Sequence, residues 1–179
     1  MSAVLRLLLS LALGVAAGSG VLRLLHGEDL DVSTRVGPVE PGDRVRDAVA
    51  GVADDRVHVS ADGRAMLDEE GEAAVAAALA ERDLPVHVVV WRHSMDAGYD
   101  HYIEAAEQIV AELDEPSLVV LWQGPEDSHA EATEGWTAVY RTDETGSVSP
   151  EPDYLGDARK RLLEWIEQLP DEPLRRLDD

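Results

Sequence analysis

Residues 85–91 read PVHVVVW, and this near-continuous apolar run decides the fold of the chain. A strand with apolar side chains on both faces is buried on both sides, which is typical of a parallel sheet covered by helices. A second run of this kind, SLVVLW, follows at residues 117–122. Between the runs, one apolar helical stripe consists of Tyr102, Ala106, Ile109, Val110 and Leu113. Two buried strands joined by a helix predict a parallel βαβ unit.

Further elements extend this unit in both directions. Residues 56–60 alternate apolar and polar side chains as a short strand, and Asp68 is a candidate N-cap for an Ala-rich helix that ends near Arg82. Residues 136–141 indicate a fourth strand after an acidic loop, and residues 154–169 indicate a third helix. This order predicts the α/β class, with a single α/β/α sandwich domain whose central strands are parallel, preceded by an N-terminal hydrophobic helix and a linker.

The composition predicts four segments along the chain. They are a membrane anchor or signal peptide at residues 1–25, a linker with a short helix at residues 26–54, a globular domain at residues 55–169 and a disordered tail at residues 170–179. The linker is assigned because that stretch is rich in Gly, Asp and Val and contains two Gly/Pro turn signals. The short helix is expected from Asp43 to Val52, and the tail is expected to be disordered because it is short and terminal.

Residues 7–22 carry no charge and consist mostly of Leu, Ala, Val and Gly. A helix of this length spans about 24 Å, which is less than the roughly 30 Å of a bilayer core. Residues 3–25 are long enough for an anchor if Arg6 and Arg23 reach the two interfaces. The alternatives are a cleaved signal peptide that ends before Gly18, and a helix buried in a soluble domain. The first two readings place the bulk of the chain outside the cytoplasm, held at the cell membrane or secreted.

Charge and composition exclude several classes of function. The net charge is −22, and an anionic surface of this size repels nucleic acid, so no nucleic-acid partner is expected. The chain has no Cys, which excludes disulfides, thiolate metal sites and a Cys nucleophile. It also lacks a Gly-x-Ser-x-Gly elbow and a Gly-rich phosphate loop.

Residues 59–67 read VSADGRAML and are followed by DEE, which resembles the opening of the TPM domain. The Ala-rich helix, the two buried strands and the Tyr-containing helix continue the similarity to about residue 142. The resemblance implies a Rossmann-like α/β/α sandwich in an extracytoplasmic or thylakoid-lumen location, in some members with an acidic cation site. Acid phosphatase activity and photosystem repair are the roles proposed for that family. The chain looks like a small membrane-anchored member.

Ligands of open α/β sheets bind beyond the carboxyl ends of the strands. The carboxylates expected at that edge are Asp62, Asp96, Asp100, Glu126 and Asp127. Carboxylate oxygens bind hard cations, and a cation relieves their mutual repulsion, so the set predicts a Ca²⁺ or Mg²⁺ site. The alternative is an ordinary solvated surface, because the chain carries 37 acidic residues.

Other candidate groups carry weaker signals. His101 and Glu104 share a helix face and His93 lies one loop away, but the spacing matches no zinc signature. Ser94 follows a strand and is a turn former as readily as a nucleophile. Arg92 is the only basic residue expected near the rim, so a phosphatase would depend on bound metal for positive charge.

The sequence therefore predicts a membrane-tethered, extracytoplasmic binding or accessory module of the cell envelope. We expect it to be non-catalytic, with Ca²⁺ or Mg²⁺ as candidate cofactors and the cell membrane as its partner through the N-terminal helix. The alternatives are a metal-assisted phosphatase of the TPM type and a structural partner of a membrane protein complex.

Overall fold

The computed structural model describes residues 40–93, 102–125, 127–140, 142–143, 146–147 and 156–178. The predicted N-terminal helix and residues 26–39 of the predicted linker lie outside these residues. Within the described part of the chain, no helix combines the length and the apolar character that crossing a membrane requires. The membrane anchor thus stays a prediction from the sequence.

The centre of the fold is a four-stranded sheet in the order β1-β2-β3-β4. The strands are β1 (Val57–Val59), β2 (Val86–Val90), β3 (Leu118–Trp122) and β4 (Ser128–Ala132). The first three are parallel, with Val57 opposite Val88 and Val88 opposite Val120. This confirms the mixed α/β class and the parallel central strands.

Strand β4 lies where the sequence indicated an acidic loop. It pairs antiparallel with β3, and Leu121 lies opposite His129. Its alternating small and polar residues, SHAEA, are half-buried because β4 is an edge strand, so the apolar pattern that marks β2 and β3 is absent. The prediction of a loop through this segment was therefore wrong.

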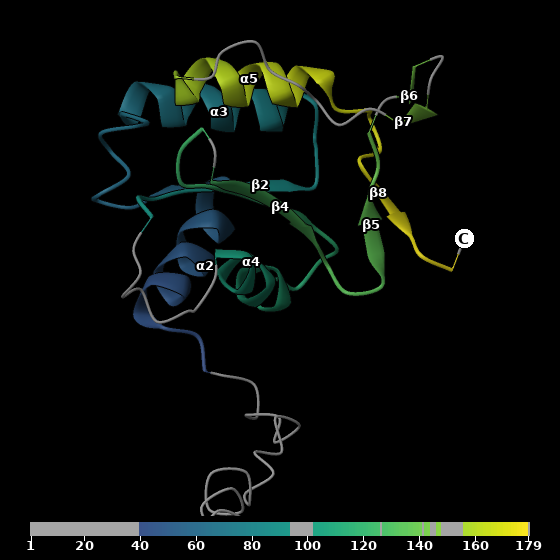
Figure 1. Ribbon diagram of the computed structural model, residues 1–179, viewed down its shortest axis with the longest axis horizontal. Coiled ribbons are helices and arrows are strands. Elements are labelled where there is room, and N and C mark those ends of the chain that lie inside the picture. The colour runs from purple at the N-terminus through teal and green to yellow at the C-terminus, as the bar shows by residue number, and fades with distance from the viewer. Residues whose placement is uncertain are drawn as a thin grey trace, which may run out of the picture. The chain divides into compact units, whose positions relative to one another are not determined.

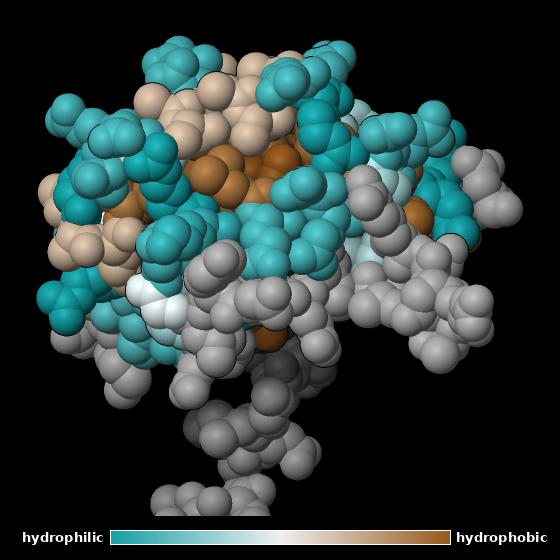
Figure 2. Space-filling model, turned by 90° about the horizontal axis from the view of Figure 1, so that it is seen from above, coloured by the Kyte–Doolittle hydropathy of each residue, from teal (hydrophilic) through white to brown (hydrophobic). Residues whose placement is uncertain are grey.

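Helices cover both faces of the sheet (Figure 1). On one face lie α3 (Glu69–Glu81) and α5 (Ala158–Gln168), and on the other lie α2 (Asp43–Asp55) and α4 (Tyr102–Ala111). The N-cap prediction for Asp68 is confirmed, since its side chain accepts a hydrogen bond of 2.8 Å from the backbone N–H of Gly71. The outer surface of the α3–α5 layer carries a band of apolar residues bordered by polar ones (Figure 2).

Alternate strand residues point to opposite faces and divide the core into two clusters. The cluster under α3 and α5 receives Val86, Val88 and Val90 from β2. The cluster under α2 and α4 receives Val89 and Trp91, together with Ile109 from α4. This double burial is the reason why β2 and β3 are apolar on both faces.

Helix α2 is part of the folded domain and not of a linker. Its Val45, Ala48 and Val52 are at most 1% exposed and belong to the cluster on the α4 side of the sheet. The compact unit begins at Pro41. The helix expected from Asp43 to Val52 is present, but the expected domain start at residue 55 is too late, because the residues that the helix packs against are distant in sequence.

The last part of the chain is also more ordered than expected. Strand β8 (Leu174–Arg176) pairs antiparallel with β5 (Trp136–Ala138), so the prediction of a disordered tail was wrong. This pairing takes β5 out of the central sheet, where the sequence pattern had suggested a fourth strand. A further two-stranded sheet pairs β6 (Thr142–Asp143) antiparallel with β7 (Gly146–Ser147).

Candidate binding site at the carboxyl edge of the sheet

The parallel strands end at one edge of the sheet, and polar side chains follow each of them. We call the residues there the rim: Ser60 and Asp62 after β1, Trp91, Arg92 and His93 after β2, and Gln123 after β3. Such an edge is where open α/β sheets hold their ligands. The rim is therefore the leading candidate for a ligand-binding site.

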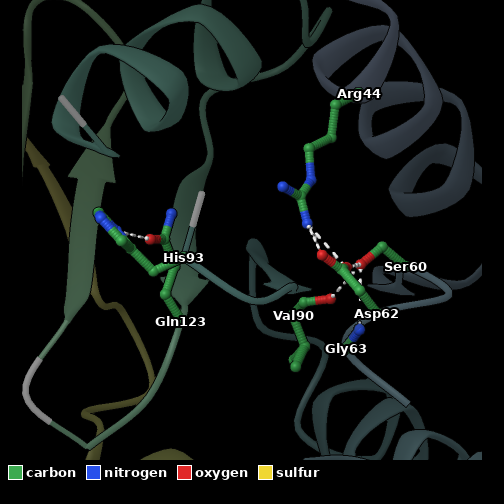
Figure 3. A network of polar contacts seen from close by, with 7 residues as sticks. All are labelled: Arg44, Ser60, Asp62, Gly63, Val90, His93 and Gln123. Atoms are coloured by element: carbon green, nitrogen blue, oxygen red, sulfur yellow. Dashed lines mark hydrogen bonds and ion pairs between the residues drawn. The ribbon is translucent and has the colours of Figure 1, made fainter. Parts of the chain in front are cut away.

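A guanidinium from α2 is the central feature of the rim. Arg44 Nη2 donates to both carboxylate oxygens of Asp62, at 2.7 Å and 2.6 Å (Figure 3). The guanidinium carbon also lies 4.7 Å from the centre of the Trp91 ring, within the range of a cation–π contact. Only 20% of the Arg44 side chain is exposed. Stacking on one side and ion pairing on another hold this guanidinium in a single position.

The Asp62 carboxylate is surrounded by donors. Besides Arg44, it accepts a hydrogen bond from the Ser60 hydroxyl and one from the backbone N–H of Arg92. Burial raises the pKa of Asp62, but the hydrogen bonds from Ser60, Arg44 and Arg92 and the charge of Arg44 outweigh it and lower the pKa below its ordinary value. Asp62 is therefore an ionised carboxylate in a cradle of donors.

A glycine makes the turn between β1 and α3 possible. A Cβ atom on Gly63 would lie 2.3 Å from the backbone oxygen of Val90. The same Val90 oxygen accepts a hydrogen bond of 3.0 Å from the Ser60 N–H, so the turn is fastened against the end of β2. This close approach fixes Ser60 and Asp62 beside β2 and explains why glycine stands between Asp62 and the following helix.

A second polar contact joins the ends of β2 and β3. His93 Nδ1 lies 3.0 Å from Gln123 Oε1 (Figure 3). Because an amide oxygen only accepts, the contact assigns the proton to Nδ1 and leaves Nε2 as an acceptor in the neutral ring. Gln123 is only 5% exposed, and its backbone N–H donates to Asp127 O at the turn into β4.

The rim side of the sheet carries more positive charge than the sequence indicated. Arg44 comes from α2, and Arg161 comes from α5, where it stacks over Trp122 at 5.0 Å and donates to Pro125 O at 3.1 Å. Sequence reasoning found only Arg92 because both other arginines belong to helices far from the strand ends along the chain. The apolar stripe in residues 43–52 was the signal that could have located Arg44, because an apolar helix face needs a sheet or helix to pack against.

The five predicted cation ligands are not all described. Asp96, Asp100 and Glu126 lie outside the described residues, as do Ser94 and His101. Asp62 follows β1 and Asp127 precedes β4, which are three strands apart in the sheet order. At about 4.8 Å per strand, this separation is roughly 14 Å. Ca²⁺ holds its ligands at about 2.5 Å, so the positions of the two strands alone do not bring these carboxylates together.

The described residues also hold no acidic or histidine cluster suited to a metal. No group of three or more His, Cys, Asp or Glu side chains in the described part of the chain could coordinate one ion. Asp62 is instead neutralised by Arg44, so a cation that used it would have to displace a guanidinium. The full five-residue cation site stays a prediction that depends on its other members.

The Ser60 hydroxyl is the candidate nucleophile among the described rim residues, and the carboxylate of Asp62 is its nearest base. The Ser60 hydroxyl donates to Asp62 and lies 3.3 Å from the Val90 oxygen, and the structure records no histidine contact to it. His93 is engaged with an amide. Nucleophilic catalysis needs a base in hydrogen-bond contact with the hydroxyl. The base in contact with the Ser60 hydroxyl is the Asp62 carboxylate, and its charge is paired with the Arg44 guanidinium.

A separate cavity of about 720 Å³ lies at the opposite edge, where β2 and β3 begin. His87 contributes to its wall, together with Arg56 from the end of α2 and Glu112 and Glu115 after α4. Burial lowers the pKa of His87, although a hydrogen bond with the Val52 carbonyl opposes this effect. The cavity is open and lined by both charges, so it defines no ligand as clearly as the rim does.

The fold and the rim define a mixed α/β domain with a polar site at the carboxyl edge of its sheet. Comparisons with protein-family models, curated proteins and solved structures found no match for the chain. The resemblance to the TPM domain therefore stays a prediction.

Proposed function

We propose that the protein is a membrane-tethered, extracytoplasmic binding or accessory module of the cell envelope, and that it is non-catalytic. The observation that carries the proposal is the Arg44–Asp62 ion pair stacked on Trp91. It gives the rim a rigid, oriented donor group, which is what recognition requires. It also neutralises the Asp62 carboxylate that metal-assisted hydrolysis would use.

The tether is supported by the change in character along the chain. Residues 7–22 carry no charge, whereas the whole chain has a net charge of −22. A surface of that charge is repelled by anionic lipid headgroups. A domain of this kind needs a covalent tether to stay at a membrane, and the apolar run supplies one.

The metal-assisted phosphatase of the TPM type is the main alternative. The three arginines on the rim side reduce the need for metal as a source of positive charge, which favours this alternative more than the sequence did. It still requires a nucleophile or an activated water, and the carboxylate that contacts the Ser60 hydroxyl is already paired with Arg44. A structural role in a membrane protein complex would need neither turnover nor a rim ligand.

Cell fractionation tests the tether. We expect the full-length protein to stay with membranes after an alkaline carbonate wash, and to be cleaved by protease added to intact spheroplasts. A variant that lacks residues 3–25 should appear in the soluble fraction. Protection of the full-length protein from external protease would refute the extracytoplasmic location.

A phosphate-ester assay tests the absence of catalysis. The purified protein should show no hydrolysis of a generic aryl phosphate with Ca²⁺, with Mg²⁺ or with EDTA. Asp83→Asn is the matched control for Asp62→Asn, because Asp83 also pairs with an arginine, Arg56, at 3.1 Å but away from the rim. Turnover that Asp62→Asn abolishes and Asp83→Asn preserves would establish the phosphatase instead.

A further inference from the structure

The donors of the Arg44 guanidinium are only partly used. A guanidinium has five N–H groups, and both recorded bonds to Asp62 come from Nη2. Within the described residues, Nη1 and Nε donate to no recorded acceptor. The stack on Trp91 uses the face of the guanidinium and leaves its in-plane donors available. One side of this well-positioned cation is therefore unoccupied by any of the described residues.

This edge faces the rest of the rim. Figure 3 shows one guanidinium nitrogen pointing away from Asp62, on the side of the pair formed by His93 and Gln123. The side chain of Arg92, exposed at the end of the neighbouring strand, adds a second positive charge. The Arg44 side chain is 20% exposed, and none of its nitrogens is among the buried atoms without a hydrogen-bond partner, so a ligand from solvent can reach it.

We infer that the rim binds a small organic carboxylate through the free edge of the Arg44 guanidinium, with Arg92 as a second positive group. This inference rests on the proposed function, because it names the ligand class of the proposed binding site. The planar fork of an arginine matches the two oxygens of a carboxylate. Asp62 shows that this guanidinium binds a carboxylate, there through Nη2 alone.

Charge decides between a carboxylate and a phosphate. The chain carries a net charge of −22, so each additional negative charge on a ligand meets greater repulsion. A carboxylate brings one charge and a phosphate brings up to two. A singly charged ligand therefore suits a site that has two arginines and one neighbouring carboxylate.

A titration of the full-length protein with acetate tests the inference, with chloride as the replaced anion at constant ionic strength. The readouts are the NMR resonances of the Trp91 indole N–H and the Arg44 Nε–H, the latter assigned by its absence in Arg44→Gln. We expect a saturable shift of both resonances with acetate. No saturable shift would overturn the inference.

Variants separate the rim from general electrostatics. Arg44→Gln should abolish the acetate-dependent shift of Trp91, and Arg92→Gln should weaken binding about threefold, the size expected for one exposed charge. Arg46→Gln is the matched control, because Arg46 lies on the same helix but pairs with Asp43. Equal weakening by Arg46→Gln and Arg92→Gln would overturn the inference. If Arg44→Gln does not fold, the comparison of Arg92→Gln with Arg46→Gln still tests the inference, because Arg92 is exposed and its substitution should not affect folding.

Asp62→Asn distinguishes the carboxylate site from the cation site that the sequence predicted. Removing this negative charge should tighten acetate binding. At a cation site, the same substitution should instead weaken the binding of Ca²⁺ or Mg²⁺. A saturable response to either cation, lost in Asp62→Asn and without a response to acetate, would overturn the inference. A response to inorganic phosphate alone would also overturn it. These binding results are independent of the cell fractionation and the phosphate-ester assay. Failure of the carboxylate site can therefore be distinguished from failure of the proposed function.

Discussion

The two faces of the sheet differ in the chemistry that they bury. Under α3 and α5, the strands β1 and β2 contribute only valines, among them Val57 and Val88. On the side of α2 and α4, the same two strands place His58 and His87 beside α2, and the guanidinium of Arg44 lies over the ring of Trp91. Each strand thus has one histidine between two valines.

This difference shows how the fold separates stability from function. The buried side chains of the α3–α5 face are apolar, and its helices were recognisable from their sequence patterns. The other face holds titratable groups and the helix that delivers Arg44 to the rim. We expect changes on the first face to alter stability alone, and changes on the second to alter stability, pH dependence and the rim together.

The largest effect is expected from Leu79→Ala on the apolar face. Leu79 is fully buried in α3, and truncation of a buried Leu costs about 2–5 kcal/mol of unfolding free energy. Chemical denaturation measures this loss. The acetate response of the folded fraction should stay unchanged, and its loss would break the proposed separation between the two faces.

Val52→Ala tests whether α2 belongs to the core. Val52 is fully buried against the sheet, so we expect a loss of about 1–3 kcal/mol in unfolding free energy. Ala53→Ser, at the next and exposed position, should change stability by less than about 0.5 kcal/mol. Equal and negligible effects of both substitutions would show that α2 is part of a linker and not of the core.

Gly63→Ala should disturb the rim through the backbone. The added methyl would lie 2.3 Å from Val90 O, and forced overpacking costs about 1–3 kcal/mol. Gly156→Ala is the control, since a Cβ there meets no atom within 4 Å. We expect Gly63→Ala, and not Gly156→Ala, to shift the Trp91 indole resonance. Identical spectra would show that the turn does not position Asp62.

The smallest expected effect is the pH dependence of stability that arises from His58 and His87, on the side of the sheet covered by α2 and α4. Burial lowers the pKa of His58, with Asp47 and Glu72 opposing and Arg64 and Arg44 reinforcing the shift. Burial also lowers the pKa of His87, with the Val52 hydrogen bond opposing and the charge of Arg56 reinforcing the shift. Both histidines touch α2, His58 beside Gly51 and His87 at Val52.

The sign of this dependence follows from linkage. Because the folded pKa lies below the ordinary value of 6.5, the unfolded chain binds protons first as the pH falls. Stability is complete above about pH 6.5 and decreases as the pH falls toward the folded pKa values. Urea denaturation of the wild type and of a His58→Gln/His87→Gln variant measures it, and the variant should show a shallower decrease. Parallel curves would exclude these histidines as the cause.

Local patterns predicted a substantial part of the fold. The apolar runs that became β2 and β3, the stripe of α4 and the cap at Asp68 depend on neighbours within a few residues, so they could be read directly. Strand β4 was missed because an edge strand needs no apolar pattern. Strand β8 was missed because only its distant partner β5 makes it a strand.

The candidate site was predicted only in its position. The strand ends indicated the carboxyl edge and Asp62, but not the partner of Asp62. Arg44 lies 18 residues earlier, in a segment interpreted as a linker. Its role could not be derived from spacing, because a helix docked across the sheet brings it there.

The amino-acid sequence by itself determined the α/β class, the doubly buried strands and the acidic surface, because side-chain periodicity and charge are local properties. It also carries the prediction of an N-terminal membrane tether. Only the tertiary structure decided that α2 is core, that β5 pairs with β8 and that Asp62 faces an arginine. These features depend on which apolar faces and which charges meet across the fold, and burial selects those partners without regard to their distance along the chain.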